Sequence, residues 1–200
     1  MKKEISLLAT AGLLMSCVGL CRAESVTYYT SGVYNYDSTS SPILEFGDGT
    51  SMTFDPITPT ILTVPGDISY GNIDTTGVGL TTETVPAGTT FTLTFTEESP
   101  TPTTFTDTAT VSGMIDSTFS NIHVDFPTTS FMIGDDTFTI AQPEGGFVIV
   151  PPDDDAGLTT INGELTLTVT SGTPEPSTSM LLIGGGLTSL AFLLRRRKKV

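Results

Sequence analysis

The stretch TFTLTFT, residues 90–96, contains the pattern that decides the fold. Phe91, Leu93 and Phe95 alternate with threonines, so a strand over these residues has one apolar face and one face of threonine hydroxyls. The same period of two recurs in two later stretches, NIHVDF (residues 121–126) and LTLTVT (residues 165–170). The chain is therefore predicted to contain several strands that each bury one face.

Clusters of Gly, Pro, Asp and Ser separate these strands from others. The turn signals are FGDGTS (46–51), VPGD (64–67), ESPTPT (98–103) and IGDD (133–136). Further strands are expected around residues 26–36, 43–47, 60–70, 104–114 and 130–141. GFVIVP at 146–151 is continuously apolar, which is typical of a central strand.

Many short strands with turns at this spacing predict an all-β fold, a single antiparallel β-sandwich of the jelly-roll or Ig-like type over residues 24–172. The abundant threonine fits, because a polar β-branched residue suits the solvated face of a sheet. The competing interpretation is a flexible Thr- and Pro-rich stalk, in which the alternating Phe, Leu and Val would have no purpose.

Residues 1–23 have the three parts of a secretory signal peptide. Lys2 and Lys3 precede an apolar run, and Cys21-Arg22-Ala23 offers small residues at both recognition positions. Signal peptidase is expected to cut between Ala23 and Glu24 after passage through the secretion translocon. The alternatives are a buried N-terminal helix and a lipoprotein signal with Cys17 in the lipobox. Both cysteines of the chain, Cys17 and Cys21, lie inside this segment.

The C-terminal residues have three parts in a fixed order. Pro174-Glu175-Pro176 comes first, and an apolar run at 179–194 follows, which is predicted to be a short transmembrane helix. The basic cluster comes last and consists of Arg195, Arg196, Arg197, Lys198 and Lys199. By the positive-inside rule this cluster stays cytoplasmic, so everything upstream of the helix is expected outside. The alternative is an ordinary tail anchor that follows a chance Pro-Glu-Pro.

This order of parts, over residues 173–200, resembles the PEP-CTERM sorting signal of exported bacterial proteins. The resemblance implies a membrane-embedded exosortase that recognises Pro174-Glu175-Pro176 and cuts nearby. It also implies a protein that is held transiently at the inner membrane and then reaches the cell surface or the exterior, in a bacterium that makes exopolysaccharide. The order of FGDG, VPGDISYGN, TTFTLTF and GDDTFTI also resembles the choice-of-anchor passenger domains, a likeness that implies a fold class and no chemistry.

Charge is distributed unevenly along the chain. All 8 Lys and Arg lie in the two terminal segments, whereas 20 of the 22 acidic residues lie in residues 24–173, because Glu4 and Glu175 alone fall outside. This part of the chain, the passenger, therefore contains no Lys or Arg. Nucleic acid is excluded as a partner, since phosphate binding depends on Lys and Arg. Solubility is the plain explanation of the charge, and cation-bridged contact with acidic polysaccharide is the functional one.

Candidate sites in the passenger are few. His123 is expected on the outward face of its strand beside Asp125, where a hydrogen bond between the two is possible. One His cannot make a multi-His zinc site, so an exposed structural His is the favoured interpretation. Tyr34 and Tyr36 share one strand face; packing in the core or at an edge is the default interpretation, and a small stacking platform for sugars is the alternative.

Two runs of aspartate are the best cation candidates. Asp153-Asp154-Asp155 and Asp135-Asp136 supply carboxylate oxygens that calcium prefers, although the EF-hand spacing is absent and solvated turns are the alternative. The runs TLTFT, TDTAT and TLTVT suggest an ice-binding threonine array. Such an array needs a regular ladder, and no fixed sequence period links these segments.

Together these features predict a noncatalytic surface or matrix protein associated with exopolysaccharide and biofilm. A carbohydrate-binding module or a carbohydrate-active hydrolase on the same sandwich is the alternative, since this fold hosts both.

Overall fold

The structure of the protein, a computed structural model, describes residues 24–47, 49–77 and 81–167. Most of these residues lie in strands, and the helical element that they contain is the 3-10 turn η2 (Asp155–Gly157). The predicted all-β class is confirmed for this part of the chain. The predicted signal segment and transmembrane helix lie outside it. Among the described residues, no helix has the length and apolar character that crossing a membrane requires.

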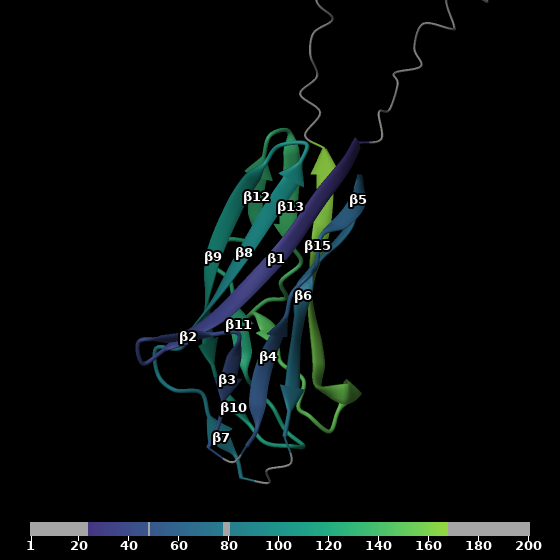
Figure 1. Ribbon diagram of the computed structural model, residues 1–200. Coiled ribbons are helices and arrows are strands. Elements are labelled where there is room, and N and C mark those ends of the chain that lie inside the picture. The colour runs from purple at the N-terminus through teal and green to yellow at the C-terminus, as the bar shows by residue number, and fades with distance from the viewer. Residues whose placement is uncertain (1–23, 48, 78–80, 168–200) are drawn as a thin grey trace, which may run out of the picture. The chain divides into compact units, whose positions relative to one another are not determined.

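The first sheet, sheet A, has seven antiparallel strands in the order β14-β11-β9-β8-β1-β2, with β5 paired to the other half of β1. Figure 1 shows β9, β8 and β1 side by side in this sheet. Its strands are β1 (Glu24–Tyr36), β2 (Thr39–Ser41), β5 (Thr60–Val64), β8 (Thr90–Ser99), β9 (Thr103–Ser112), β11 (His123–Asp125) and β14 (Phe147–Val148).

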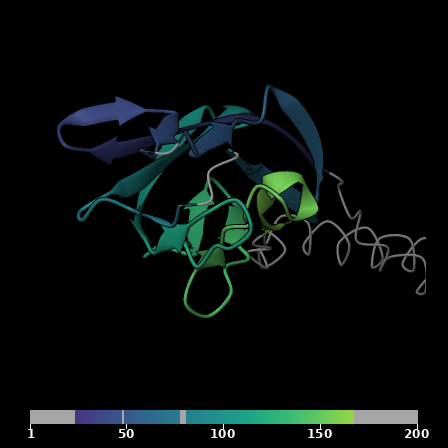
Figure 2. The same ribbon diagram turned by 90° about the horizontal axis from the view of Figure 1, so that it is seen from below.

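The second sheet, sheet B, has six antiparallel strands in the order β12-β13-β15-β6-β4-β3. Its strands are β3 (Ile43–Glu45), β4 (Ser51–Asp55), β6 (Gly66–Thr76), β12 (Ser130–Ile133), β13 (Asp136–Ile140) and β15 (Leu158–Leu167). Two short strands, β7 (Glu83–Thr84) and β10 (Met114–Ile115), pair with each other. In Figure 2 the β1–β2 hairpin, in purple, extends to one side, as it does in Figure 1.

The inner faces of the two sheets form one hydrophobic core. Phe95 of sheet A is fully buried, and its ring lies 4.7 Å from Phe138 and 5.9 Å from Tyr70, both of sheet B. A Cβ at Gly32 of β1 would lie 2.6 Å from Phe91 and 2.7 Å from Phe54, so glycine makes room where these two rings meet. The sheets therefore pack face to face as a β-sandwich, held by aromatic contacts and burial of apolar surface.

The structure corrects several details of the predicted strands. GFVIVP is not a central strand, because β14 forms the edge of sheet A and Val148 is 53% exposed. The strand predicted at 60–70 is divided into β5 and β6, which lie in different sheets, and the one at 130–141 is the hairpin β12–β13. The short strands β2, β4, β7 and β10 were not predicted as separate elements.

Candidate functional site

The outward face of β8 and β9 is a regular array of threonines. Four pairs lie directly opposite each other across the two strands, without a register shift. We call this array the threonine face; its pairs are Thr90–Thr110, Thr92–Thr108, Thr94–Thr106 and Thr96–Thr104. The hydroxyls of Thr92 and Thr108 are 3.2 Å apart and those of Thr96 and Thr104 are 3.3 Å apart, so each pair shares a hydrogen bond.

Strand β1 widens this face by a third column. Four side chains of β1 lie opposite the β8 threonines: Tyr29, Ser31, Val33 and Asn35. Asn35 donates a hydrogen bond to the Thr92 hydroxyl at 3.0 Å. None of the twelve residues in these four rows is charged, although the passenger is strongly acidic. The face therefore offers hydroxyl donors, hydroxyl acceptors and methyl groups to a neutral partner.

The sequence argument against a threonine ladder is wrong for two of the three segments. TLTFT and TDTAT lie on β8 and β9 and pair in register, although no sequence period links them. The third segment, TLTVT, begins at Thr166 on β15 of sheet B. Adjacent strands of a sandwich sheet are rotated by about 20–25° relative to each other, so the array is not the flat lattice that ice binding requires.

A second group of residues lies where β1 begins and β15 ends. Glu97 of β8 is 1% exposed and Asp136 of β13 is 4% exposed, and Asp136 pairs with Leu167, the last residue of β15. Glu97 takes the next inward position after Phe91, Leu93 and Phe95, so the period that buries those rings also buries its carboxyl group.

Two oxygens of this carboxyl pair lack a hydrogen-bond partner. Oε1 of Glu97 accepts the backbone N–H of Thr101 at 2.9 Å, but Oε2 of Glu97 and Oδ1 of Asp136 are buried and unpartnered. Burial raises the pKa of Glu97; the Thr101 N–H opposes this shift, and the charges of Asp136 and Glu24 add to it. Burial, Glu24 and Asp135 raise the pKa of Asp136. An uncompensated carboxylate in this position is costly, so the pair favours protonation or a nearby cation.

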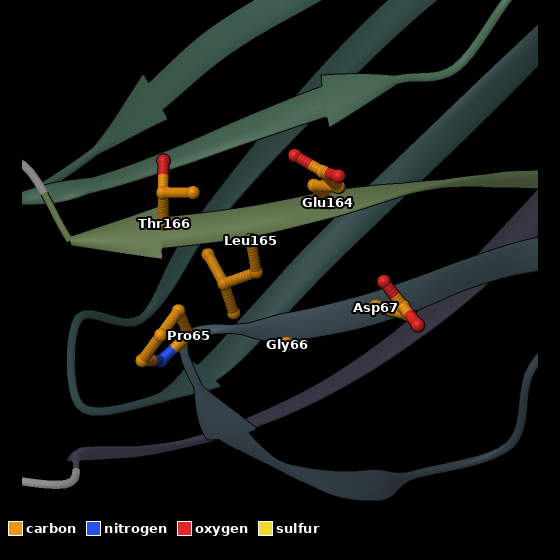
Figure 3. A pocket seen from close by; sticks show the side chains of 6 residues that line it. All are labelled: Pro65, Gly66, Asp67, Glu164, Leu165 and Thr166. Carbon is orange, nitrogen blue, oxygen red and sulfur yellow. The ribbon is translucent and has the colours of Figure 1, made fainter.

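A shallow pocket of about 290 Å³ lies on β15 and β6. Figure 3 shows its six lining residues, which include the carboxylates of Asp67 and Glu164 and no aromatic side chain. Asp67 and Glu164 lie directly opposite each other on the two strands, and both are exposed. A sugar site usually offers aromatic faces on which sugar rings can stack. The apolar lining residues of this pocket are Pro65 and Leu165, and no aromatic side chain lines it.

His123 and Asp125 do not form the hydrogen bond that their shared face allows. Both residues lie on β11, but Nδ1 of His123 donates to the carbonyl oxygen of Gly145 at 2.8 Å. Oδ1 of Asp125 instead accepts a hydrogen bond from Nε2 of Gln142 at 2.7 Å. His123 is thus held by the backbone of the loop before β14, which is a structural role.

The default interpretation of the tyrosines, core or edge packing, is confirmed for Tyr34, and the alternative of a shared stacking platform is not. Tyr34 is 1% exposed, and its ring lies 5.0 Å from that of Phe91. Tyr36 is 37% exposed at the end of β1, so the two rings do not form one exposed surface.

The two aspartate runs occupy different environments. Asp153, Asp154 and Asp155 are exposed, and the backbone N–H groups of Asp153 and Asp154 bond to Ser117 O and Pro151 O. The other run consists of Asp135 and Asp136, and Asp136 is buried. Within the described residues, no three His, Cys, Asp or Glu side chains form a group that could hold a metal ion. The calcium hypothesis therefore rests on sequence alone.

The predicted sorting residues lie in the tail, beyond the described residues. Comparison with family models matches residues 173–198 to the PEP-CTERM protein-sorting motif. The tail carries a PEP-CTERM motif. The match includes Pro174-Glu175-Pro176 and Arg195 to Lys198, so the predicted resemblance is confirmed, and Lys199 lies just past the match. A PEP-CTERM motif implies exosortase-dependent sorting of an exported protein through a membrane-anchored signal.

The remaining comparisons add no relative. No curated protein and no solved structure gave a significant match to the chain. The likeness to choice-of-anchor domains, and the choice between jelly-roll and Ig-like topology, therefore stay predictions.

Proposed function

We propose that the protein is an exported, noncatalytic component of the cell surface or extracellular matrix, and that its sandwich contacts exopolysaccharide through the threonine face. The PEP-CTERM motif carries this proposal, because it assigns the chain to an export route. In the proposed sequence of events signal peptidase cuts after Ala23, the C-terminal segment holds the protein in the inner membrane, and exosortase then releases it outward. The passenger is the part that acts outside.

The threonine face supports contact with a neutral region of a polysaccharide. Its paired hydroxyls can donate to and accept from sugar hydroxyls, and the methyl groups can pack against the apolar faces of sugar rings. The rest of the passenger is acidic and has no Lys or Arg, so an acidic polymer is repelled unless divalent cations bridge the two. An uncharged face is the part of this surface that a polymer approaches most easily.

Binding of the processed, exported protein to the host's own exopolysaccharide tests the matrix role. Thr92→Glu with Thr108→Glu places two carboxylates at the centre of the threonine face and should reduce retention on immobilised polysaccharide at least tenfold. Thr160→Glu with Asn162→Glu adds two carboxylates to exposed positions of β15 in sheet B, outside the pocket, and serves as the matched control. Equal retention of all three proteins would contradict the assignment of the face, and no retention of the wild type would contradict the matrix role.

A carbohydrate-active enzyme is the second candidate. Its support is the Asp67–Glu164 carboxylate pair in the shallow pocket, since two nearby carboxylates are what glycoside hydrolysis uses. Release of reducing ends from the host's exopolysaccharide, lost in Glu164→Gln, would establish that function in place of the noncatalytic one. We expect no release.

A further inference from the structure

The side chains of the passenger supply no Lys or Arg to the carboxyl pair Glu97–Asp136. Residues 24–173 contain no Lys or Arg, and the ring of His123 is held at Gly145. Both carboxyl groups are nonetheless covered, and each has one oxygen without a hydrogen-bond partner. Buried carboxylates are normally paired with a cation or with donors. The pair is therefore either protonated or compensated by a cation that is not one of these side chains.

The inward face of β1 runs from Glu24 to the position opposite Glu97. Glu24 is the first residue of β1. Because side chains alternate along a strand, Glu24 lies on the same inward side as Val26 and Tyr28, and Ser25 points outward. Tyr28 pairs directly with Glu97 in the β1–β8 ladder. The charge of Glu24 acts on both members of the pair, since it contributes to the raised pKa of Glu97 and of Asp136.

Cleavage of the predicted signal segment changes the charge at this position. A cut between Ala23 and Glu24 converts a neutral peptide group into an α-ammonium on Glu24. The α-nitrogen and the side-chain carboxyl of one glutamate are four bonds apart, so they lie within roughly 5 Å of each other. The new positive charge therefore arises in the region where Glu24 already acts on the pair.

We propose that the α-ammonium of Glu24 in the mature chain is the counter-ion of the buried Glu97–Asp136 carboxyl pair. The acidic groups around it are Glu24 itself on β1, Glu97 on β8, Asp136 on β13 and Asp135 in the β12–β13 turn. Signal cleavage thereby supplies the counter-ion of the two buried carboxyl groups. A passenger that is still joined to its signal segment lacks this positive charge. This inference rests on the export step of the proposed function and is independent of exosortase and of polysaccharide binding.

The mature chain offers an unusually direct probe of this contact. Once the tail is removed, the α-amino group is the chain's one amine, since residues 24–173 contain no Lys. Reductive methylation with ¹³C-formaldehyde then labels that group alone, and its pKa can be read from the NMR shift as pH is varied. Nearby carboxylates should raise this pKa at least about one unit above the ordinary range of 7.7–8.0. Glu97→Gln with Asp136→Asn should return it to that range, whereas Glu98→Gln, which changes an exposed neighbour, should not.

Acetylation of the same amine tests the effect on stability. Removing the α-ammonium should lower the Tm of the exported protein at pH 7 by roughly 3–5 °C, which corresponds to a pKa shift of about one unit in a domain of this size. The double variant should lose this response, and Glu98→Gln should keep it. An α-amino pKa in the ordinary range together with an unchanged Tm on acetylation would overturn the proposal.

N-terminal sequencing of the exported protein separates this failure from others. A chain that begins at any residue other than Glu24 contradicts the inference directly, whatever happens at the tail. Conversely, an intact C-terminal tail contradicts the sorting claim but leaves the N-terminal measurement valid. The labelled α-amine is then distinguished from the amines of Lys198 and Lys199 by its lower pKa.

Discussion

Replacing Phe95 with alanine tests whether the alternation in TFTLTFT separates a core face from a functional face. Phe95 is fully buried, and its ring contacts four others: Tyr28 at 5.4 Å, Tyr70 at 5.9 Å, Phe131 at 5.6 Å and Phe138 at 4.7 Å. Three of these rings belong to sheet B, so Phe95 joins the two layers. The substitution removes that junction and leaves a cavity between the sheets.

The expected loss is large. Phe→Ala substitutions in cores cost about 3–5 kcal/mol, and each aromatic pair adds about 0.5–1.5 kcal/mol beyond area burial. Because Phe95 has no exposed surface and four ring partners, we expect a loss of about 4–5 kcal/mol in the free energy of unfolding. In a domain of this size each kcal/mol lowers the Tm by about 4 °C, so the Tm should fall by roughly 15–20 °C.

The control is the neighbouring residue of the same strand. Thr94 points to the threonine face, and Thr94→Ala should cost less than about 1 kcal/mol. Urea denaturation of the exported protein, followed by circular dichroism, measures both losses. Similar losses for the two variants would refute the two-face account of β8, and with it the basis of the threonine face.

Three further predictions concern the charges of the passenger. When the α-amine is acetylated, Glu97 and Asp136 keep their raised pKa values, so the folded state binds more protons than the unfolded state. Stability should then fall as pH rises above the ordinary carboxyl range of about 4, and Glu97→Gln should remove most of that fall in pH-dependent melts. Asp67→Asn should raise the free energy of unfolding by a few tenths of a kcal/mol in urea titrations, because it relieves the like charge of Glu164 directly opposite; Asp74→Asn, on the same strand with Thr53 and Leu158 as partners, should give no gain. If Asp153, Asp154 and Asp155 bind calcium, millimolar calcium should raise the Tm and Asp153→Asn should reduce that rise, whereas an unchanged Tm would leave these residues as solvated turns.

The sequence predicts the strands best where the period of two is long. Phe91, Leu93 and Phe95 identified β8, and the structure confirms which face they bury. The same rule places Glu97 on the inward side, so the buried carboxyl group was detectable as a charged residue that continues an apolar face. Strand β4 has only five residues, and Met52 and Phe54 are its two inward apolar residues. This alternation is too short to be recognised as a strand from the sequence.

Pairing between strands could not be predicted, because it depends on which edges meet in three dimensions. The threonine face exists because β8 and β9 pair without a shift on either side of the ESPTPT turn, and neither TLTFT nor TDTAT alone specifies that register. GFVIVP was misassigned for a related reason. Phe147 and Ile149 are buried and Val148 is exposed, so a run of apolar residues can belong to a short edge strand as well as to a central one.

Mass spectrometry of the protein recovered outside the cell tests the central claim most directly. The PEP-CTERM motif at 173–198 implies that exosortase cuts near Pro174-Glu175-Pro176. The account predicts a chain that begins at Glu24 and ends near Pro176, without residues 181–200. Replacing the three motif residues with alanine should leave a full-length, membrane-bound C-terminus instead. An intact tail through Val200 on wild-type protein outside the cell would contradict the account.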